Sequence, residues 1–331
     1  MQPTYLETAA QAVQARSRIR SHIYQTPVIP SRSNSSRHDG TQLLFKAENF
    51  QLTGSFKIRG AMSKMSAPSS LSSSKGSSSS GQRLITASSG NHGIGASCAA
   101  HALSKELTVV LPESVVSSKL KKIQSYGVTV ILHGAETGLA EQHAQKLAAE
   151  ESYTYISPYN DPDIVAGQGS IGLEIIEQCP DVDNIFVAMG GGGLISGIGA
   201  VCKAFCPRIK VYGVSAHNSK ALAESMKAGR VVETEHEQTL ADAVAGGMDE
   251  DAITLPLAMS VVEEVVVCSE EEIADALRSM AFEENMIVEG AAALALAGYN
   301  KVAEKVAGQT SVVVLCGANY DQGVITKTIF G

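Results

Sequence analysis

The sequence predicts an α/β fold in which mostly parallel strands alternate with helices. Short apolar segments rich in Val, Ile and Leu recur along the chain, and longer segments of helical composition separate them. The chain has 331 residues, of which 44% are hydrophobic, and this is enough to bury the cores of two units. Glycine-rich or polar turns follow several of the apolar segments, as they do at the strand ends of α/β proteins.

The composition argues against nucleic-acid and membrane partners. The chain has 26 basic and 34 acidic residues, a net charge of −8, which repels nucleic acid and anionic lipid. It has no Trp and only 5% aromatic residues, so a base-stacking surface is not expected. No apolar run approaches the roughly 20 residues that a membrane-spanning helix needs.

The cysteines and the first residues predict a cytoplasmic protein. The six cysteines are scattered, and only Cys202 and Cys206 lie close together in the sequence. Neither a second pair nor a His cluster accompanies them, so we expect reduced thiols and no metal. The N-terminus lacks a charged segment followed by an apolar core, so no signal peptide is predicted.

The first part of the chain enters the body of the fold and then reaches a lysine at a helix start. We predict a helix over residues 6–22, an extended segment over 26–30 and a strand over 43–48. A further helix begins near Phe56, with Thr53 or Ser55 as its cap. Residues 66–81 are Ser-rich, and we interpret them as a tolerated surface insertion.

The middle of the chain predicts a small parallel block of three strand–helix units. The expected strands are 84–87, 107–111 and 128–132, and the expected helices are 92–103, 115–126 and 137–151. Such a block forms a small domain of its own.

The second half continues the same alternation. We expect helices over 165–178, 194–205, 219–228, from 270 onward and over 290–307, and strands over 185–189, 210–214, 261–268 and 311–316. Gly229 stands where a helix C-cap is expected, and the segment 231–257 is irregular.

Four consecutive glycines, followed by Leu194, lie between a predicted strand and a predicted helix: Gly190, Gly191, Gly192 and Gly193. A strand, a glycine turn and a helix N-terminus present backbone N–H groups to an anion, typically a phosphate. Ile195 stands where a dinucleotide fingerprint has its third glycine, and the Gly-Lys-Ser/Thr end of a nucleotide-triphosphate loop is missing. The run therefore predicts a site for the single phosphate of a small cofactor.

Polar or reactive residues follow three other predicted strands or turns, in the segments around Lys57, Ser88 to His92, and Cys316 to Asn319. In an open α/β sheet, ligands bind beyond the carboxyl ends of the strands, so these segments are expected to converge. A lysine at a helix start, a phosphate cup and a polar strand-end residue together indicate pyridoxal 5′-phosphate as the cofactor.

At these residues the sequence resembles a known family, the fold-type II pyridoxal-phosphate enzymes, in the serine/threonine dehydratase and serine racemase group. The matching stretches run in the family's order over nearly the whole chain: GSFKIRGA at 54–61, SSGNHG at 88–93, IVAGQG at 164–169, GGGGL at 190–194, ADAVAGG at 241–247 and CGAN at 316–319. The resemblance implies a tryptophan-synthase-β-like fold with two open, mostly parallel sheets flanked by helices. It divides the chain into a large cofactor-binding domain, 1–82 and 159–331, and a small substrate-loop domain, 83–158.

The resemblance also implies a role for each matching residue. Lys57 forms the Schiff base and acts as the catalytic base, Phe56 lies against the cofactor ring, and Asn91 binds the ring oxygen. The loop that holds the substrate carboxylate is formed by Ser88, Ser89, Gly90, Asn91 and His92. The phosphate is held by Gly190, Gly191, Gly192, Gly193 and Leu194, and Cys316 faces the ring nitrogen.

The activity implied is dehydration and deamination of a β-hydroxy amino acid, such as L-threonine or L-serine, to a 2-oxo acid and ammonia. Ser89 keeps amino-acid racemisation open, because serine at this position acts as an acid/base in racemase-like relatives. A dehydratase of another substrate, such as hydroxyaspartate or phenylserine, is a further alternative. Residues 215–221 contain no carboxylate, so the divalent-cation site of some relatives is not expected here. The family also implies a homodimer.

Overall fold

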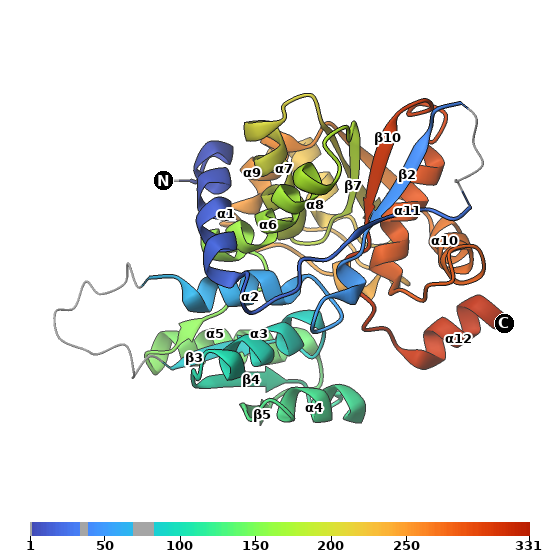
Figure 1. Ribbon diagram of the computed structural model, residues 1–331. Coiled ribbons are helices and arrows are strands. Elements are labelled where there is room, and N and C mark those ends of the chain that lie inside the picture. Colours follow the sequence, from blue (N-terminus) through green and yellow to red (C-terminus); the bar gives the residue numbers. More distant parts are fainter. Residues whose placement is uncertain (1, 34–38, 69–82) are drawn as a thin grey trace.

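A computed structural model describes residues 2–33, 39–68 and 83–331 of the chain. Its strands form two separate sheets, one with six strands and one with four, and helices flank both (Figure 1). The prediction of two open, mostly parallel sheets is therefore confirmed. Most of the Ser-rich segment 66–81 lies outside the described residues.

The six-stranded sheet collects strands from both ends of the chain. Its order is β1 (Val28–Pro30), β2 (Gln42–Lys46), β10 (Thr310–Val314), β7 (Asn184–Ala188), β8 (Lys210–Ala216) and β9 (Glu264–Cys268). Only β1 pairs antiparallel, and the other neighbours are parallel. The central strands are continuous apolar runs because helices cover both faces.

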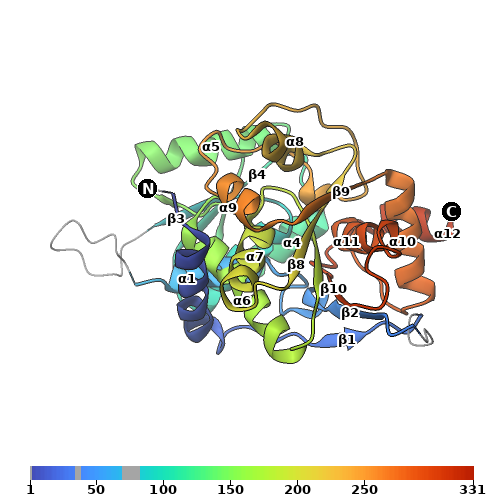
Figure 2. The same ribbon diagram turned by 90° about the horizontal axis from the view of Figure 1, so that it is seen from above.

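The helices of this half lie on both sides of the six-stranded sheet. Figure 1 shows one group, α1 (Tyr5–Ile19), α6 (Pro162–Gln178) and α7 (Gly193–Phe205), across the sheet from α10 (Glu270–Phe282) and α11 (Gly290–Lys301). Seen from above, α1, α6 and α7 lie on one side of β8 and β10, and α10 and α11 lie on the other (Figure 2). The remaining helices are α8 (Ala221–Ala228), α9 (Thr254–Val261) and α12 (Gln322–Phe330), with the short 3₁₀ helices η1 (Glu48–Phe50) and η3 (Asp242–Val244). None of the described helices combines the length and the apolar composition that a bilayer-spanning helix needs.

The four-stranded sheet is entirely parallel. Its order is β5 (Thr129–Leu132), β4 (Leu107–Leu111), β3 (Leu84–Ala87) and β6 (Thr154–Tyr155), and its helices are α3 (Asn91–Ala102), α4 (Ser117–Gln124) and α5 (Thr137–Glu150). Alternate residues of β3 face opposite ways: Leu84 packs in the core with α3, and Ile85 packs in the core with α5. The division into domains at residues 82/83 and 158/159 stays a prediction that this second sheet supports.

Helix α2 (Lys57–Ser66) lies between the two sheets and contacts α3 on one side and α6 on the other (Figure 1). Its predicted side-chain cap is wrong. Phe56 is the N-cap and makes no capping hydrogen bond, and the Thr53 hydroxyl donates instead to the Ser55 carbonyl at 3.4 Å. Backbone hydrogen bonds to Cys316 and Ala318, which follow β10, hold this turn, so a local side-chain cap is not needed.

Other element predictions also differ from the structure. The strand predicted from 261 begins at Glu264, because Val261 still belongs to α9, which packs on α7. The helix predicted over 290–307 ends at Lys301. Strand β6 and helix α12 were not predicted, since the first has two residues and the second lies beyond the last apolar strand. The predicted C-cap is confirmed, because Gly229 has a left-handed φ of +69°.

Candidate active site

A cavity of about 670 Å³ lies where both sheets and α2 meet, and every residue predicted for the site lines it. These are Phe56, Lys57, Ser88, Ser89, Gly90, Asn91, His92, Gly190, Gly191, Gly192, Gly193, Leu194 and Cys316. A second, larger hollow of about 950 Å³ on α1, α6 and α7 contains none of them. The convergence of strand-end segments marks the first cavity as the candidate site.

The glycine run forms one wall of this cavity. Strand β7 ends at Ala188, Gly192 turns the chain with a left-handed φ of +87°, and α7 begins at Gly193. A Cβ on Gly191 would lie 2.5 Å from the ring of Tyr159, so only glycine fits there. No described residue accepts a hydrogen bond from the N–H groups of Gly190, Gly191 or Gly192, which leaves these donors for an anion.

Lys57 is the first residue of α2, and the strand end at Cys316 holds the turn before it. The Phe56 N–H donates to the Cys316 carbonyl at 3.1 Å, and the Ala318 N–H donates to the Gly54 carbonyl at 2.8 Å. The Lys57 ammonium donates to the Pro158 carbonyl at 2.9 Å. Burial lowers the pKa of Lys57 to about 8, partly opposed by the nearby Cys316 and Glu289. The amine is therefore partly unprotonated near neutral pH.

The loop from Ser88 to His92 joins β3 to α3. The Gly90 N–H donates to the Ser88 hydroxyl at 3.2 Å, and the first N–H groups of α3 face no partner within their helix. The ring of His92 is buried, and its Nε2 lies 3.1 Å from the Thr86 hydroxyl and 3.0 Å from the Ile156 carbonyl. Burial, together with the charge of Lys57, lowers the pKa of His92 to about 3. The imidazole is thus a neutral structural group.

A buried carboxylate that we did not predict lies between two of the predicted residues. Glu289 is 2% exposed, and the Asn91 side-chain amide donates to both of its oxygens at 2.9 Å. The Cys316 thiol lies 3.6 Å from Glu289 Oε1, and the Asn319 N–H donates to Oε2 at 3.2 Å. Burial raises the pKa of Glu289. Burial, with the adjacent Glu289, raises the pKa of Cys316 well above its ordinary value, so the thiol is neutral.

Both ends of the Asn91 amide therefore have protein partners, because its oxygen accepts from Asn319 Nδ2 at 2.7 Å. The sequence does contain a signal for Glu289: it is the one charged residue in the apolar run 286–292. Burying a lone carboxylate in such a run costs desolvation free energy, so its presence indicates that a specific hydrogen-bond partner compensates for the cost.

Other polar residues reach the cavity from turns and helix starts. They are Lys119, Thr137, Glu141, Tyr159, Asp242, Asp249 and Asn319. Burial raises the pKa of Asp242, and the Lys119 charge opposes this shift. Within the described ranges, no three His, Cys, Asp or Glu side chains gather as a metal site requires.

The chain is similar to known proteins in both sequence and structure. Residues 19–317 match the family described as pyridoxal-phosphate dependent enzyme. The chain is 36% identical over 317 residues to the L-threonine ammonia-lyase of Thermotoga maritima, covering 96% of this chain and 76% of that one. It is 33% identical over 329 residues to the L-threo-3-hydroxyaspartate ammonia-lyase of Saccharomyces cerevisiae, covering 99% and 97%. Maize serine racemase superposes with a TM-score of 0.85 at 29% identity, covering 97% and 96%.

Proposed function

Because the chain belongs to the pyridoxal-phosphate-dependent enzyme family, we propose that it is an ammonia-lyase acting on a β-hydroxy amino acid. L-Threonine and L-serine are the proposed substrates. The β-hydroxyl group leaves as water, a second water is taken up, and the products are ammonia and a 2-oxo acid. One observation carries this proposal: the half-buried amine of Lys57 and the unpartnered N–H groups of the glycine run line the same cavity.

The residues present fit pyridoxal 5′-phosphate. The glycine run is an anion cradle that a Cβ at Gly191 would block, and Lys57 has the lowered pKa that covalent attachment to an aldehyde needs. Phe56 is 9% exposed and borders the cavity, where it offers an apolar face to a ring. When bound, the cofactor withdraws electrons from the substrate Cα and makes its proton removable.

The chain's own residues divide the remaining tasks in this proposal. Lys57 takes the proton from the substrate Cα, which a pKa of about 8 permits near neutral pH. Backbone N–H groups at the start of α3 and the Ser88 hydroxyl orient the substrate carboxylate. The neutral Cys316 thiol faces the ring nitrogen, and Gly190 to Leu194 hold the phosphate. Asn91 binds the ring oxygen by exchanging part of its contact with Glu289 or Asn319.

Racemisation is the second candidate, and the placement of Ser89 favours it. Ser89 lines the cavity, and its hydroxyl has no hydrogen-bond partner among the described residues. Such a hydroxyl is available to return a proton to Cα from another direction. The hydroxyaspartate relative makes an acidic substrate a further alternative, and Lys119 at the cavity rim is the cation that such a substrate needs.

The test is a product assay on the purified protein. We expect a cofactor absorbance band near ~410–420 nm that Lys57→Ala abolishes, and a 2-oxo acid as the main product from L-threonine or L-serine. A panel that includes hydroxyaspartate and phenylserine identifies the substrate. A colourless protein that stays colourless with added cofactor, or a D-amino acid as the sole product, would overturn the proposal.

We also propose that the protein is a cytoplasmic homodimer. The support for the compartment is that all six cysteines are free and five of them are buried, as in proteins of reducing compartments. The support for the dimer is the family alone. We further propose residues 83–158 as the small domain, because they contain the whole four-stranded sheet and the loop at Ser88 to His92.

A further inference from the structure

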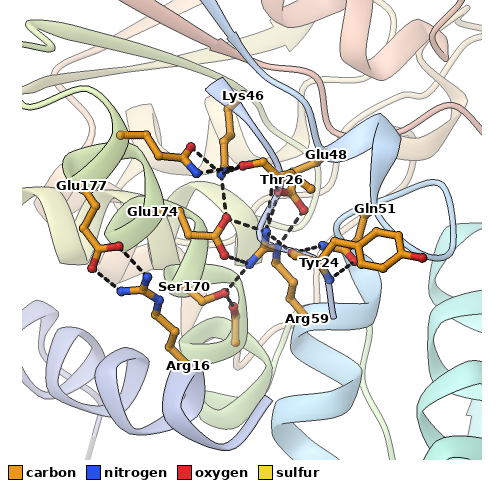
Figure 3. Close-up of polar contacts among 12 residues, drawn as sticks. Arg16, Tyr24, Thr26, Lys46, Glu48, Gln51, Arg59, Ser170, Glu174 and Glu177 are labelled. Atoms are coloured by element: carbon orange, nitrogen blue, oxygen red, sulfur yellow. Dashed lines mark hydrogen bonds and ion pairs between the residues drawn. The ribbon is translucent and has the colours of Figure 1, made fainter. Parts of the chain in front are cut away.

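A cluster of buried charges lies between α2 and α6 (Figure 3), and none of its residues lines the cavity. Its cations are Lys46 and Arg59, and its anions are Glu48 and Glu174; each is at most 3% exposed. The four charges sum to zero, and they come from β2, η1, α2 and α6. Buried ion pairs seldom add net stability, so stability alone does not explain this cluster. A role in positioning the elements that the charges join does explain it.

Arg59 is the centre of this cluster. Its Nε and one terminal nitrogen donate to the two oxygens of Glu48, both at 2.8 Å. Its terminal nitrogens also donate to the two oxygens of Glu174, at 2.7 and 2.8 Å. One guanidinium therefore makes a fork to each of two carboxylates, a geometry that an ammonium group cannot reproduce.

Lys46 shares Glu174 but makes no hydrogen bond to a described residue of α2. Its ammonium donates to Glu174 at 2.6 Å, to the Thr26 carbonyl at 2.6 Å and to Gln178 at 3.2 Å. It therefore joins β2 to α6, whereas Arg59 joins α2 to both η1 and α6. The two cations differ in which element they hold.

Arg59 follows Lys57 by two residues in the first turn of α2. Two helical residues correspond to a rotation of about 200°, so the two side chains leave the helix on opposite sides. The helix cannot move toward α6, because a Cβ on Gly167 of α6 would already lie 2.5 Å from the Arg59 carbonyl. The forks therefore fix the start of α2 in place.

The effect of the cluster on Lys57 is positional. The groups that oppose the effect of burial on the pKa of the Lys57 amine are Cys316 and Glu289, and the four cluster residues are not among them. Because the cluster is neutral as a whole, its field at the amine is small. Loss of the two forks with the charge kept, as in Arg59→Lys, would therefore move the amine without changing its pKa.

We infer that Arg59 is a positioning residue, whose forks to Glu48 and Glu174 hold the first turn of α2 so that the Lys57 amine meets the cofactor aldehyde. This inference rests on the proposed role of Lys57. Misplacement of a reacting group by about 1 Å costs on the order of 100-fold in rate, so this position has kinetic consequences.

Arg59→Met and Lys46→Met form a matched pair of variants. Each removes one buried cation, leaves a long apolar side chain, and leaves the cluster with a net charge of −1. Both are expected to lower the urea midpoint of unfolding. We expect only Arg59→Met to slow the appearance of the ~410–420 nm band on mixing apoprotein with pyridoxal phosphate, and to lower kcat, by about 10- to 100-fold, with KM within about threefold of wild type.

A charge-conserving pair covers the case in which the Met variants do not fold. Arg59→Lys keeps the charge and loses both forks, and it should still slow cofactor attachment; Lys46→Arg should not. Equal effects of the two substitutions on attachment rate, or no effect of either, would overturn the positioning role. If Lys57→Ala retains the absorbance band, the proposed function itself fails, and that result is separate from any Arg59 outcome.

Discussion

The side-chain amide of Asn91 donates to both carboxylate oxygens of Glu289, each at 2.9 Å. The two residues are 198 positions apart. Asn91 begins the helix that follows β3 of the four-stranded sheet, and Glu289 precedes α11, which packs on the six-stranded sheet. The carboxylate is buried, and a buried carboxylate must be hydrogen-bonded to be tolerated. The pair therefore ties α3 to the start of α11 directly beside the Cys316 thiol.

The pH dependence of cofactor attachment is the first prediction. Only an unprotonated amine attacks an aldehyde, and burial lowers the pKa of Lys57 to about 8. The rate of cofactor attachment should therefore rise with pH and level off above about 8. The measurement is stopped-flow absorbance of apoprotein mixed with pyridoxal phosphate. A rate still rising toward the ordinary lysine pKa of about 10.4 would contradict the burial of the amine.

Glu289→Gln should shift that pH profile. The negative charge of Glu289 raises the pKa of Lys57 against the effect of burial, so its removal should lower the midpoint below that of wild type. Glu141→Gln is the control, because Glu141 lines the cavity but is not among the charges that act on Lys57. A midpoint that stays in place in Glu289→Gln would mean that Glu289 carries no charge near neutral pH.

Part of the convergence of the site could be predicted from the sequence because it follows from strand direction. Parallel strands of one sheet bring their carboxyl ends to one edge, so the turns after β7 and β10 lie on the same side of the six-stranded sheet. The turn after β3 belongs to the other sheet, and the turn before Lys57 follows no strand, so these two reach the cavity through the packing of the two sheets and α2, which strand direction does not predict. Apolar runs of four to six residues also predicted the ends of most strands to within one or two residues of where the structure places them.

Glu289 was missed for a physical reason. Its partners Asn91 and Cys316 are far from it in the sequence, and no local pattern encodes a contact between distant turns. The failed cap at Thr53 or Ser55 has the same origin, since the turn before α2 is held by the distant residues 316–318. Val261 was misassigned because a short β-branched run does not distinguish a strand from a helix end packed on α7.

The lowered pKa of His92 leads to a prediction of how the free energy of unfolding depends on pH. Its pKa falls from 6.5 to about 3 on folding, mainly through burial. Between these values only the unfolded chain binds the proton, so stability present above pH 6.5 is lost as the pH falls toward 3. Between pH 7 and pH 5 this loss amounts to about 2 kcal/mol. Urea unfolding of apoprotein should show it for wild type relative to His92→Gln; parallel pH curves would contradict it.

Gly191→Ala should weaken cofactor binding. The added Cβ would lie 2.5 Å from the Tyr159 ring, so either the ring or the glycine run must shift. A shift of the run moves its N–H groups, and cofactor affinity falls. Gly138→Ala in α5 is the control, because its Cβ meets nothing within 4 Å. That variant should keep its affinity and gain about 0.5–1 kcal/mol of stability. An unchanged cofactor affinity in Gly191→Ala would contradict the proposal that the glycine run binds the cofactor phosphate.

Ser89→Ala distinguishes elimination from racemisation. The Ser89 hydroxyl lines the cavity without a hydrogen-bond partner among the described residues, so its removal leaves no buried group unsatisfied and should not alter folding. Elimination needs one base at Cα, which is Lys57 in our proposal, whereas racemisation needs a second group to return the proton. We therefore expect Ser89→Ala to keep 2-oxo acid formation within about threefold of wild type and to lose any D-enantiomer, since general acid–base help is worth about 100-fold or more.

The measurement is parallel assay of 2-oxo acid and D-amino acid from the same reaction, with solvent deuterium incorporation at Cα as a third readout. Ser88→Ala is the matched control, because it removes a hydroxyl one residue away that accepts from the Gly90 N–H. Ser88→Ala should raise KM through the substrate carboxylate and leave the ratio of the two products unchanged. If Ser89→Ala instead abolishes 2-oxo acid formation, Ser89 takes part in elimination itself, and Lys57 is not sufficient for the proton transfer that we assign to it.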